Sequence, residues 1–352
     1  MEMIIISEKV DIFSNRVEDW LKLNNEKIYR INSEQPIRLI DLRIQGGDCE
    51  ISITRLNDNE EIKITKHKVW HRRGFFSFSI YGDSEDVCEE FQVFLNREAR
   101  ALSSGILMIL KTKELIIGNH IENKGNKLYH LFMASTNGLN VPDTFVINSK
   151  VMLREIYQQH SNLITKPISD SFLGTINGEN LVGFVNKFDN SSFDHLPETF
   201  FPTLFQNKID RKFEIRSFLF CGEVFSMATF LVKDDNNTDI KEIENSMKRH
   251  IPYKLPSDVE DKMLNLACKL DIDTASFDFI VDKSGNIYFL EINYLAAELS
   301  RYYLEAIYSI EAELRGINLK RLNQYGQLNE MSYHCNYSIE EFVANKLTEN
   351  GR

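Results

Sequence analysis

The feature that most constrains the fold is the segment 276–293, in which two runs rich in β-branched and aromatic residues flank a short polar stretch. The polar stretch, Lys-Ser-Gly-Asn at 283–286, has the composition of a four-residue hairpin loop. The two runs therefore predict antiparallel strands joined by this loop. We take Asp282 to pair with Ile287, which fixes the register of every pair farther from the loop.

With that register, Asp278 lies directly opposite Glu291. Side chains alternate between the faces of a strand, so Asn293 shares a face with Glu291, and Asp278 lies beside them. Opposed carboxylates repel each other, and a divalent cation with hard oxygen ligands compensates for this. Magnesium takes one or two carboxylates and fills its other positions with waters and nucleotide phosphates, so the hairpin predicts a magnesium site. A solvated hairpin with an acidic outer face is the alternative interpretation.

A second predicted strand, 212–220, places Glu214 and Arg216 on one of its faces. An arginine between carboxylates is suited to a transferring phosphate, because its guanidinium makes charge-assisted and often bidentate hydrogen bonds. A cross-strand ion pair is an equally common arrangement for these residue types.

Two lysines are further candidates for contacts with phosphate groups. Lys166 ends a predicted strand and precedes a polar, glycine-bearing loop at 169–180, and Lys150 opens a predicted helix. Most lysines are simply exposed at the surface, which is the competing interpretation. The sequence has no GxxxxGK followed by Ser or Thr, which excludes a P-loop, and no GxGxxG follows a predicted strand.

The composition excludes several other classes of protein. The formal net charge is -11, from 41 basic and 52 acidic residues, and no basic stripe is present, which disfavours binding to nucleic acid. No apolar run reaches the roughly 18 residues that cross a bilayer, so no membrane association is expected. The five cysteines are dispersed without CxxC spacing, which disfavours a zinc site and a disulfide framework. The first residues lack the features of a signal peptide and predict a strand, and the expected location is the cytoplasm.

The pattern of predicted elements divides the 352 residues into three α/β units. The first unit, 1–120, contains predicted strands at its start and a long helix over 86–110. The second begins near residue 126 with a helix that stops at Asn137-Gly138, followed by a strand, a helix capped by Ser149 and another strand. The third is rich in strands, which are predicted around 201–206, 212–220, 223–232, 276–282 and 286–293. EIKITKHKVWHRR, at 61–73, predicts a single alternating strand.

At this point the residues resemble ATP-grasp enzymes, and more narrowly the graspetide (microviridin-type) peptide ligases, in particular the maturases of grasp-with-spasm systems. The resemblance covers most of the chain, through short motifs whose order and spacing are specific. The motifs are Asp11 to Trp20 with Tyr29 to Asn32, Val69 to Gly74, Asn126 to Leu128 with Gly138-Leu139 and Pro142 to Thr144, Phe201 to Gln206, Lys212 to Arg216, Pro252 to Pro256, and Phe289 to Asn293.

The resemblance implies an α/β fold with three parts. These are an N-terminal pre-ATP-grasp α/β domain at 1–120, a central lobe at 121–203, and a C-terminal antiparallel-sheet lobe at 204–352, with the nucleotide between the last two. It also implies a reaction: with ATP and Mg²⁺ as cofactors, a side-chain carboxylate of a precursor peptide, consisting of leader and core, is activated as an acyl-phosphate. A Ser/Thr hydroxyl or Lys amine of the same peptide then attacks, giving an ω-ester or ω-amide macrocycle.

The resemblance further implies roles for individual residues. Arg216, with Glu214 on the same strand, would act at the reacting phosphate, and Arg72 and Arg73 would meet acidic residues of the peptide, although a structural ion pair is an equal alternative for these two. The remaining expected contacts are Lys150 and Lys166 with phosphates, Leu204, Phe205 and Gln206 with adenine, and Asp278, Glu291 and Asn293 with magnesium. A homodimer is kept as a candidate state.

One departure from the family pattern lies directly after the predicted ligands. The family motif continues from the asparagine into Pro-x-Gly-Gln, whereas Tyr294 follows here and the matching Gly326-Gln327 comes after an apparent helical insertion at 294–325. If the ends of the insertion return close together, the ligand site survives. If they do not, the chain is an inactive peptide-binding relic. An ATP-grasp ligase that adds a free amino acid to a carboxylate is the third hypothesis. The motif at 70–73 and the motif at 201–206, which resembles the family's hinge, disfavour it.

Overall fold

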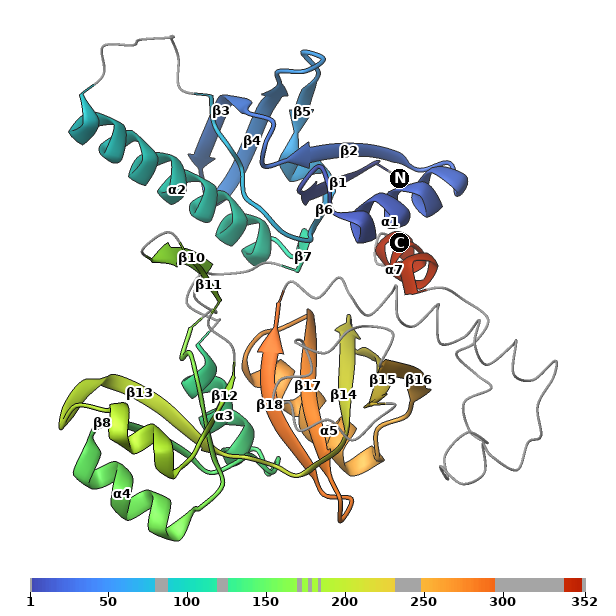
Figure 1. Cartoon of the computed structure of the whole chain (residues 1–352). Coiled ribbons are helices and arrows are strands. Elements are labelled where there is room, and N and C mark those ends of the chain that lie inside the picture. Colours follow the sequence, from blue (N-terminus) through green and yellow to red (C-terminus); the bar gives the residue numbers. More distant parts are fainter. Residues whose placement is uncertain are drawn as a thin grey trace.

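The computed structural model describes residues 2–79, 88–118, 126–169, 173–176, 179–182, 185–231, 248–294 and 339–349. These residues form mixed α/β structure with five sheets, and in Figure 1 the N-terminal part lies above the central and C-terminal parts. No helix in the described ranges is long and apolar enough to cross a membrane.

The N-terminal part is built on a parallel sheet with the strand order β2-β1-β6-β7. The apolar run at the start of the chain is buried over residues 3–7, as expected of a strand covered on both faces. Helix α2 packs on this part through Ile106 and Leu110, which are fully buried. The elements are β1 (Glu2–Ser7), α1 (Ile12–Leu23), β2 (Lys27–Asn32), β6 (Lys68–His71), α2 (Glu89–Thr112) and β7 (Ile116–Ile117).

A second, antiparallel sheet stands beside the first and consists of β3 (Ile37–Gln45), β4 (Asp48–Arg55) and β5 (Glu61–Lys63). The prediction of one strand over 61–73 was wrong. The short helix η1 (Ile64–Lys66) interrupts it, so β5 pairs with β4 while β6 pairs with β1 in the other sheet. Apolar alternation alone does not reveal such a break, because Ile62, Ile64 and Val69 are all buried.

The central part contains a sheet with the order β12-β9-β13-β8. Its first helix, α3, ends at Thr136 with Asn137 as its C-cap, and Gly138 follows with φ +80°, so the predicted glycine stop is confirmed. The predicted loop at 169–180 contains strands of a β-hairpin instead, β10 paired with β11. The elements are α3 (Lys127–Thr136), β8 (Thr144–Ser149), α4 (Lys150–Gln159), β9 (Leu163–Lys166), β10 (Leu173–Ile176), β11 (Glu179–Val182), β12 (Asn186–Phe188), η3 (Asn190–His195) and β13 (Thr199–Asn207).

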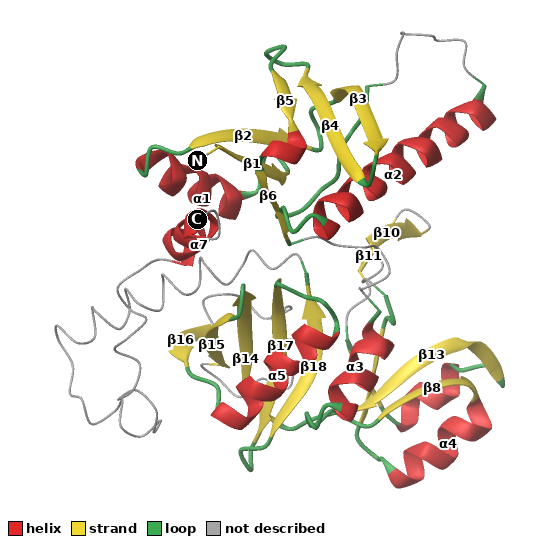
Figure 2. Ribbon diagram, turned by 180° about the vertical axis from the view of Figure 1, so that it is seen from behind, coloured by secondary structure: helices red, strands yellow, loops and turns green. Residues whose placement is uncertain are grey.

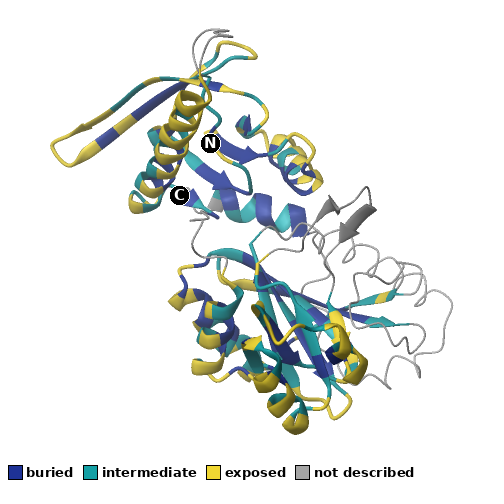
Figure 3. Ribbon diagram, turned by 60° about the vertical axis from the view of Figure 1, so that its left-hand side comes forward, coloured by how far each residue is buried: buried dark blue, intermediate teal, exposed yellow. Residues whose placement is uncertain are grey.

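The C-terminal part is an antiparallel sheet with the order β16-β15-β14-β17-β18, and helix α5 covers one face of it (Figure 2). Met263 and Leu266 of α5 are fully buried against this face, together with phenylalanines of the strands. Figure 3 shows the same layering as buried strands beneath helices whose outer sides are exposed. The elements are β14 (Arg211–Phe220), β15 (Glu223–Leu231), β16 (Lys248–Tyr253), α5 (Ser257–Lys269), β17 (Thr274–Asp282) and β18 (Ile287–Asn293).

The last described helix, α7 (Ile339–Glu349), returns to the N-terminal part and packs on α1 (Figure 1). Val343 and Leu347 are buried with Val17 of α1, and Arg16 forms a 3.2 Å ion pair with Glu340. The predicted insertion at 294–325 lies outside the described residues except for Tyr294. The predicted domain boundaries stay predictions, and strand β13 runs through the one at 203.

Candidate functional site

The hairpin of β17 and β18 brings the predicted acidic pair together through a β-bulge. Next to the loop, Val281 pairs with Ile287, so the expected pairing of Asp282 with Ile287 was wrong by one residue. The register shifts between Phe279 and Asp278, and from there the predicted pairing of Asp278 with Glu291 is confirmed.

The bulge resolves a conflict between two side chains of β18. Phe289 pairs with Phe279 on the face covered by α5 and is fully buried. In an unbroken strand Glu291, two residues on, would point into the same core. The extra residue, Leu290, turns Glu291 to the opposite face, and bulges commonly re-aim a side chain in this way beside active sites.

Arg216 of β14 completes the acidic pair on the same face of the sheet. Its Nε and Nη2 donate hydrogen bonds of 2.7 and 2.9 Å to the two carboxylate oxygens of Asp278, which is the bidentate arrangement. The amide Nδ2 of Asn293 donates to Asp278 Oδ2 at 2.8 Å and to Glu291 Oε1 at 3.3 Å. Three adjacent strands therefore place one guanidinium, two carboxylates and one amide together.

Lys127, which the sequence reasoning did not assign to the site, reaches the acidic pair from helix α3. Its Nζ lies 3.4 Å from Glu291 Oε2 and donates a 2.9 Å hydrogen bond to the carbonyl oxygen of Ser169. The signal was present in the sequence, because Lys127 lies within one of the motifs, Asn126 to Leu128, that carry the family resemblance.

The residues present fit a magnesium ion by the chemistry of their donor atoms. Two carboxylates and an amide supply hard oxygen ligands. Magnesium takes only a few ligands from a protein, so the number of these ligands also fits. Asn293 directs its amide nitrogen at the carboxylates, and half a turn of the amide presents its oxygen instead. Among the described residues, no three or more His, Cys, Asp or Glu side chains are grouped so that they could hold a metal ion.

Glu214 lies two residues before Arg216 on β14, and its carboxylate accepts a 2.8 Å hydrogen bond from Nη1 of Arg211. The side chain of Glu214 is 23% exposed and that of Arg211 is 12% exposed. This contact is an ion pair within one strand, whereas the cross-strand ion pair considered for these residue types is the one between Arg216 and Asp278.

The predicted nucleotide residues of the central part fall on two faces of one sheet. Leu204 pairs with Lys166, and Gln206 pairs with Ile164, so these four side chains share a face. Gln206 is buried and its Nε2 donates to Thr144 Oγ1 at 2.8 Å. The side chain of Phe205 points to the other face of the sheet, so Phe205 contributes only its backbone to the face that carries Lys166.

On that other face Phe205 packs edge to face with Phe188, with 5.2 Å between the ring centroids. A cavity of about 280 Å³ opens there, lined by Phe200, Thr203 and Thr165 among others. Lys166 is not among the residues that line this cavity. Lys150, the first residue of α4, donates from Nζ to the carbonyl oxygen of Leu196 at 2.9 Å.

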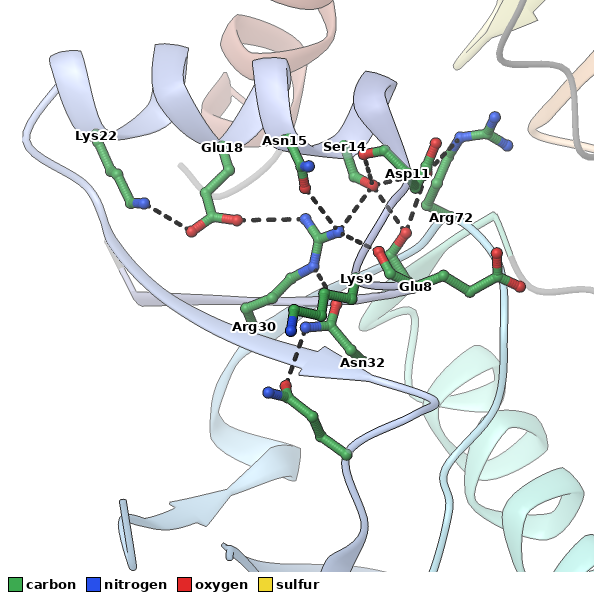
Figure 4. Close-up of polar contacts among 12 residues, drawn as sticks. Glu8, Lys9, Asp11, Ser14, Asn15, Glu18, Lys22, Arg30, Asn32 and Arg72 are labelled. Atoms are coloured by element: carbon green, nitrogen blue, oxygen red, sulfur yellow. Dashed lines mark hydrogen bonds and ion pairs between the residues drawn. The ribbon is translucent and has the colours of Figure 1, made fainter. Parts of the chain in front are cut away.

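Arg72 belongs to a polar cluster with residues of α1, of β2 and of the loop between β1 and α1 (Figure 4). Arg73 follows Arg72 in the chain. The Nε of Arg72 lies 3.5 Å from Asp11 Oδ2, and Arg73 Nη1 lies 3.2 Å from Glu8 Oε2. Arg72 is 6% exposed, and burial lowers the pKa of its guanidinium to about 10. Its guanidinium also lies 5.4 Å from the ring centre of Phe13.

The cluster continues through Asp11 and Arg30. Asp11 accepts hydrogen bonds from Ser7 and Ser14 at 3.0 and 2.6 Å. Burial opposes its charge, but Arg72 and the two hydroxyl groups outweigh burial, so the pKa of Asp11 is lowered. Arg30 donates to Ser14 Oγ and to the carbonyl oxygen of Glu8 at 3.0 and 2.9 Å. The position of Arg72 is thus fixed by a network of buried partners.

Arg72 lies toward the same face of the C-terminal sheet as the acidic pair. The Phe13 ring beneath it packs at 5.9 Å against Phe218, which follows Arg216 by two residues on β14 and so shares its face. The N-terminal cluster and the Arg216–Asp278 pair are therefore linked through one layer of side chains.

Comparisons with solved structures match the chain over almost its full length. One match is an ATP-grasp ligase from Chryseobacterium gregarium, described as RiPP-associated and solved with ADP and a leader and core peptide. It is 20% identical, with 99% of this chain and 97% of that chain covered, and the TM-score is 0.72. Another is the macrocyclase MdnC from Microcystis aeruginosa MRC bound to precursor peptide MdnA, 18% identical over 99% of this chain and 100% of that chain, with a TM-score of 0.68.

A third match is the ATP-grasp ligase PsnB, solved with a phosphomimetic variant of a minimal precursor, Mg and ADP. It is 14% identical, covers 99% of this chain and 98% of that chain, and has a TM-score of 0.65. No protein-family model and no curated protein sequence matches the chain. The chain thus has the fold of the ATP-grasp ligases, and the predicted fold class is confirmed.

Proposed function

We propose that this protein is an ATP-dependent peptide ligase that activates Asp or Glu side chains of a ribosomal precursor peptide and closes them into ω-ester or ω-amide macrocycles. The observation that carries the proposal is that Asp278 and Glu291 are paired across two strands on one face of the sheet, while the guanidinium of Arg216 donates two hydrogen bonds to Asp278. The fold, shared with ligases solved with peptides and ADP, supports the same conclusion.

In the proposed site, Asp278, Glu291 and Asn293 hold magnesium. The bound ion supplies positive charge next to the transferring phosphate. Lys166 lies on the same sheet face as Leu204 and Gln206, which places an ammonium group beside the proposed adenine segment. Lys150 is retained as a second phosphate contact, and the backbone of Phe205 as part of the adenine segment.

In the first step, a carboxylate oxygen of the peptide bonds to the γ-phosphorus of ATP as the bond to ADP breaks. Arg216 is held 2.7 Å from Asp278, so its charge is fixed beside the reacting phosphate before the reaction starts. A hydroxyl or amine of the same peptide then attacks the acyl carbon, phosphate leaves, and a proton is released. Glu214, two residues before Arg216 on β14, is retained in the proposal as acting with Arg216 at the reacting phosphate.

Arg72 and Arg73 are proposed to meet acidic side chains of the peptide. The contact of Phe13 with Phe218 supports this assignment, since it places Arg72 over the face that holds Arg216. The desolvated guanidinium of Arg72 would favour a carboxylate over a neutral side chain. Because the proposed reaction consumes ATP, the cytoplasm is the proposed location of the protein, and a homodimer remains part of the proposal.

Mass spectrometry tests the proposal. The purified protein is incubated with ATP, Mg²⁺ and a synthetic precursor peptide, for which a short neighbouring gene that encodes repeated Thr/Ser and Asp/Glu residues would be the source. We expect the loss of one water mass for each crosslink, and no loss when ATP is omitted. A mass gain in the presence of free amino acids would instead identify an amino-acid-adding ligase. Binding of the peptide without any mass change or ATP hydrolysis would identify an inactive binding module.

A further inference from the structure

Lys127 occupies a place that its own helix disfavours. It is the first residue of α3, where the unsatisfied N–H groups give the helix end a partial positive charge. A cation at this end is opposed by the helix dipole. Its location is therefore determined by its two oxygen partners, Glu291 at 3.4 Å and the carbonyl oxygen of Ser169 at 2.9 Å.

The helix that carries Lys127 is held firmly against the strand that carries Glu291. Nε2 of His130 on α3 lies 3.0 Å from the hydroxyl oxygen of Tyr294, directly after β18. The chain beyond the helix also pairs with this strand, since the N–H of Phe289 donates to the carbonyl oxygen of Asn140 at 2.8 Å. The approach of Lys127 to Glu291 is thus built into the packing of α3 on β18.

Each carboxylate of the acidic pair has a cation of the protein against it. Arg216 is bound to Asp278 through two hydrogen bonds, and Lys127 is paired with Glu291. Both members of the Lys127–Glu291 pair are shielded, with side chains 23% and 15% exposed, so solvent screens their interaction only in part. A dication that binds Glu291 must approach to within the range of the Lys127 ammonium group.

We propose that Lys127 competes with the dication for Glu291 and thereby makes metal binding depend on nucleotide. The inference rests on the proposed function, because it takes Glu291 as a metal ligand. Without nucleotide, the charges of Lys127 and Arg216 already balance the two carboxylates, and a further cation is disfavoured. The phosphates of a nucleotide add negative charge to the same place, which offsets the charge of Lys127 and admits the metal.

The test measures binding of Mn²⁺, as a paramagnetic probe for Mg²⁺, with and without ADP. The variant is Lys127→Met, and the matched control is Lys269→Met. This control removes the same charge from an exposed lysine at the end of α5, whose Nζ donates to Oδ1 of Asn137, the residue that follows α3. We expect Lys127→Met to bind Mn²⁺ alone about tenfold more tightly than the wild type, from the loss of one nearby unit charge. Lys269→Met should match the wild type, and ADP should abolish the advantage of Lys127→Met.

A purely structural ion pair cannot produce a gain in metal affinity, so the sign of the change is decisive. If Lys127→Met binds Mn²⁺ alone no better than the wild type, while the wild type binds Mn²⁺ with ADP and Glu291→Gln weakens that binding, the competition is refuted and the metal site stands. If Glu291→Gln leaves binding of Mn²⁺ with ADP unchanged, the metal site itself is refuted, and the competition with it.

Discussion

The substitution Glu291→Gln separates the role of this side chain in the reaction from its role in stability. The change keeps the shape of the side chain and removes its charge. It eliminates the ion pair with Lys127, whose partners are 23% and 15% exposed, at a cost of about 1 kcal/mol. The substitution also removes the charge repulsion between Glu291 and Asp278, which stabilises the folded protein by about 0.5 kcal/mol.

The expected net change in the free energy of unfolding is therefore below about 1 kcal/mol, and the melting temperature should shift by less than about 4 °C. Turnover should fall far more. Losing an anionic ligand weakens the charge stabilisation that a metal gives to the transferring phosphate by about 3 kcal/mol or more, which is a fall in kcat of roughly a hundredfold or greater.

The assay combines thermal unfolding with ADP formation in the presence of the precursor peptide. The matched control is Glu223→Gln, which removes the same charge from an exposed position at the start of β15 and should leave both quantities unchanged. Turnover within tenfold of the wild type in a folded Glu291→Gln variant would refute the metal assignment. A large loss of stability would refute the claim that Glu291 is dispensable for the fold.

Three further predictions concern other parts of the molecule. The lysine of Arg216→Lys cannot reproduce the two hydrogen bonds to Asp278, so kcat should fall by about tenfold to a hundredfold while the protein stays folded. An unchanged kcat would contradict the role of these two hydrogen bonds in the reaction. Burial raises the pKa of the Cys221 thiol to about 12. At pH 8, iodoacetamide should therefore label the exposed Cys88 and Cys268 before Cys221, which peptide mapping would show. Labelling of all three cysteines at equal rates would count against the burial of Cys221. The pKa of Asp11 is below its ordinary value, so the contribution of its charge to stability is present above about pH 3.8 and is lost as the pH falls through the lowered pKa. Denaturant unfolding should therefore show that Asp11→Asn is less stable than the wild type at pH 6, with a smaller difference at pH 2.5. A stability difference that stays constant between these pH values would contradict the lowered pKa.

The sequence predicts the acidic pair correctly although the assumed register is wrong at the loop. Counting from Asp282 and Ile287 gives the correct partner for Asp278 only because the bulge at Leu290 adds one residue to β18. Apolar periodicity does contain a trace of this bulge, since Phe289 and Ile292 are both buried and an unbroken strand would place them on opposite faces.

Other parts of the fold depend on contacts that a local pattern does not contain. Helix α7 has a buried stripe at Ile339, Val343 and Leu347, which is helical spacing, yet its partner α1 lies more than 300 residues earlier in the chain. The interruption of 61–73 by a short helix follows from the need to connect two different sheets. The pairing of Lys127 with Glu291 depends likewise on the docking of α3 against β18.

The central claim is that the opposed carboxylates of β17 and β18 bind a dication together with nucleotide. A crystal of the protein grown with Mn²⁺ and ADP, measured at a wavelength where manganese scatters anomalously, tests it most directly. The account predicts an anomalous peak in contact with Asp278 and Glu291, with the amide oxygen of Asn293 turned toward it. Clear density for ADP with the manganese bound elsewhere, and with the Lys127–Glu291 pair intact, would contradict the account.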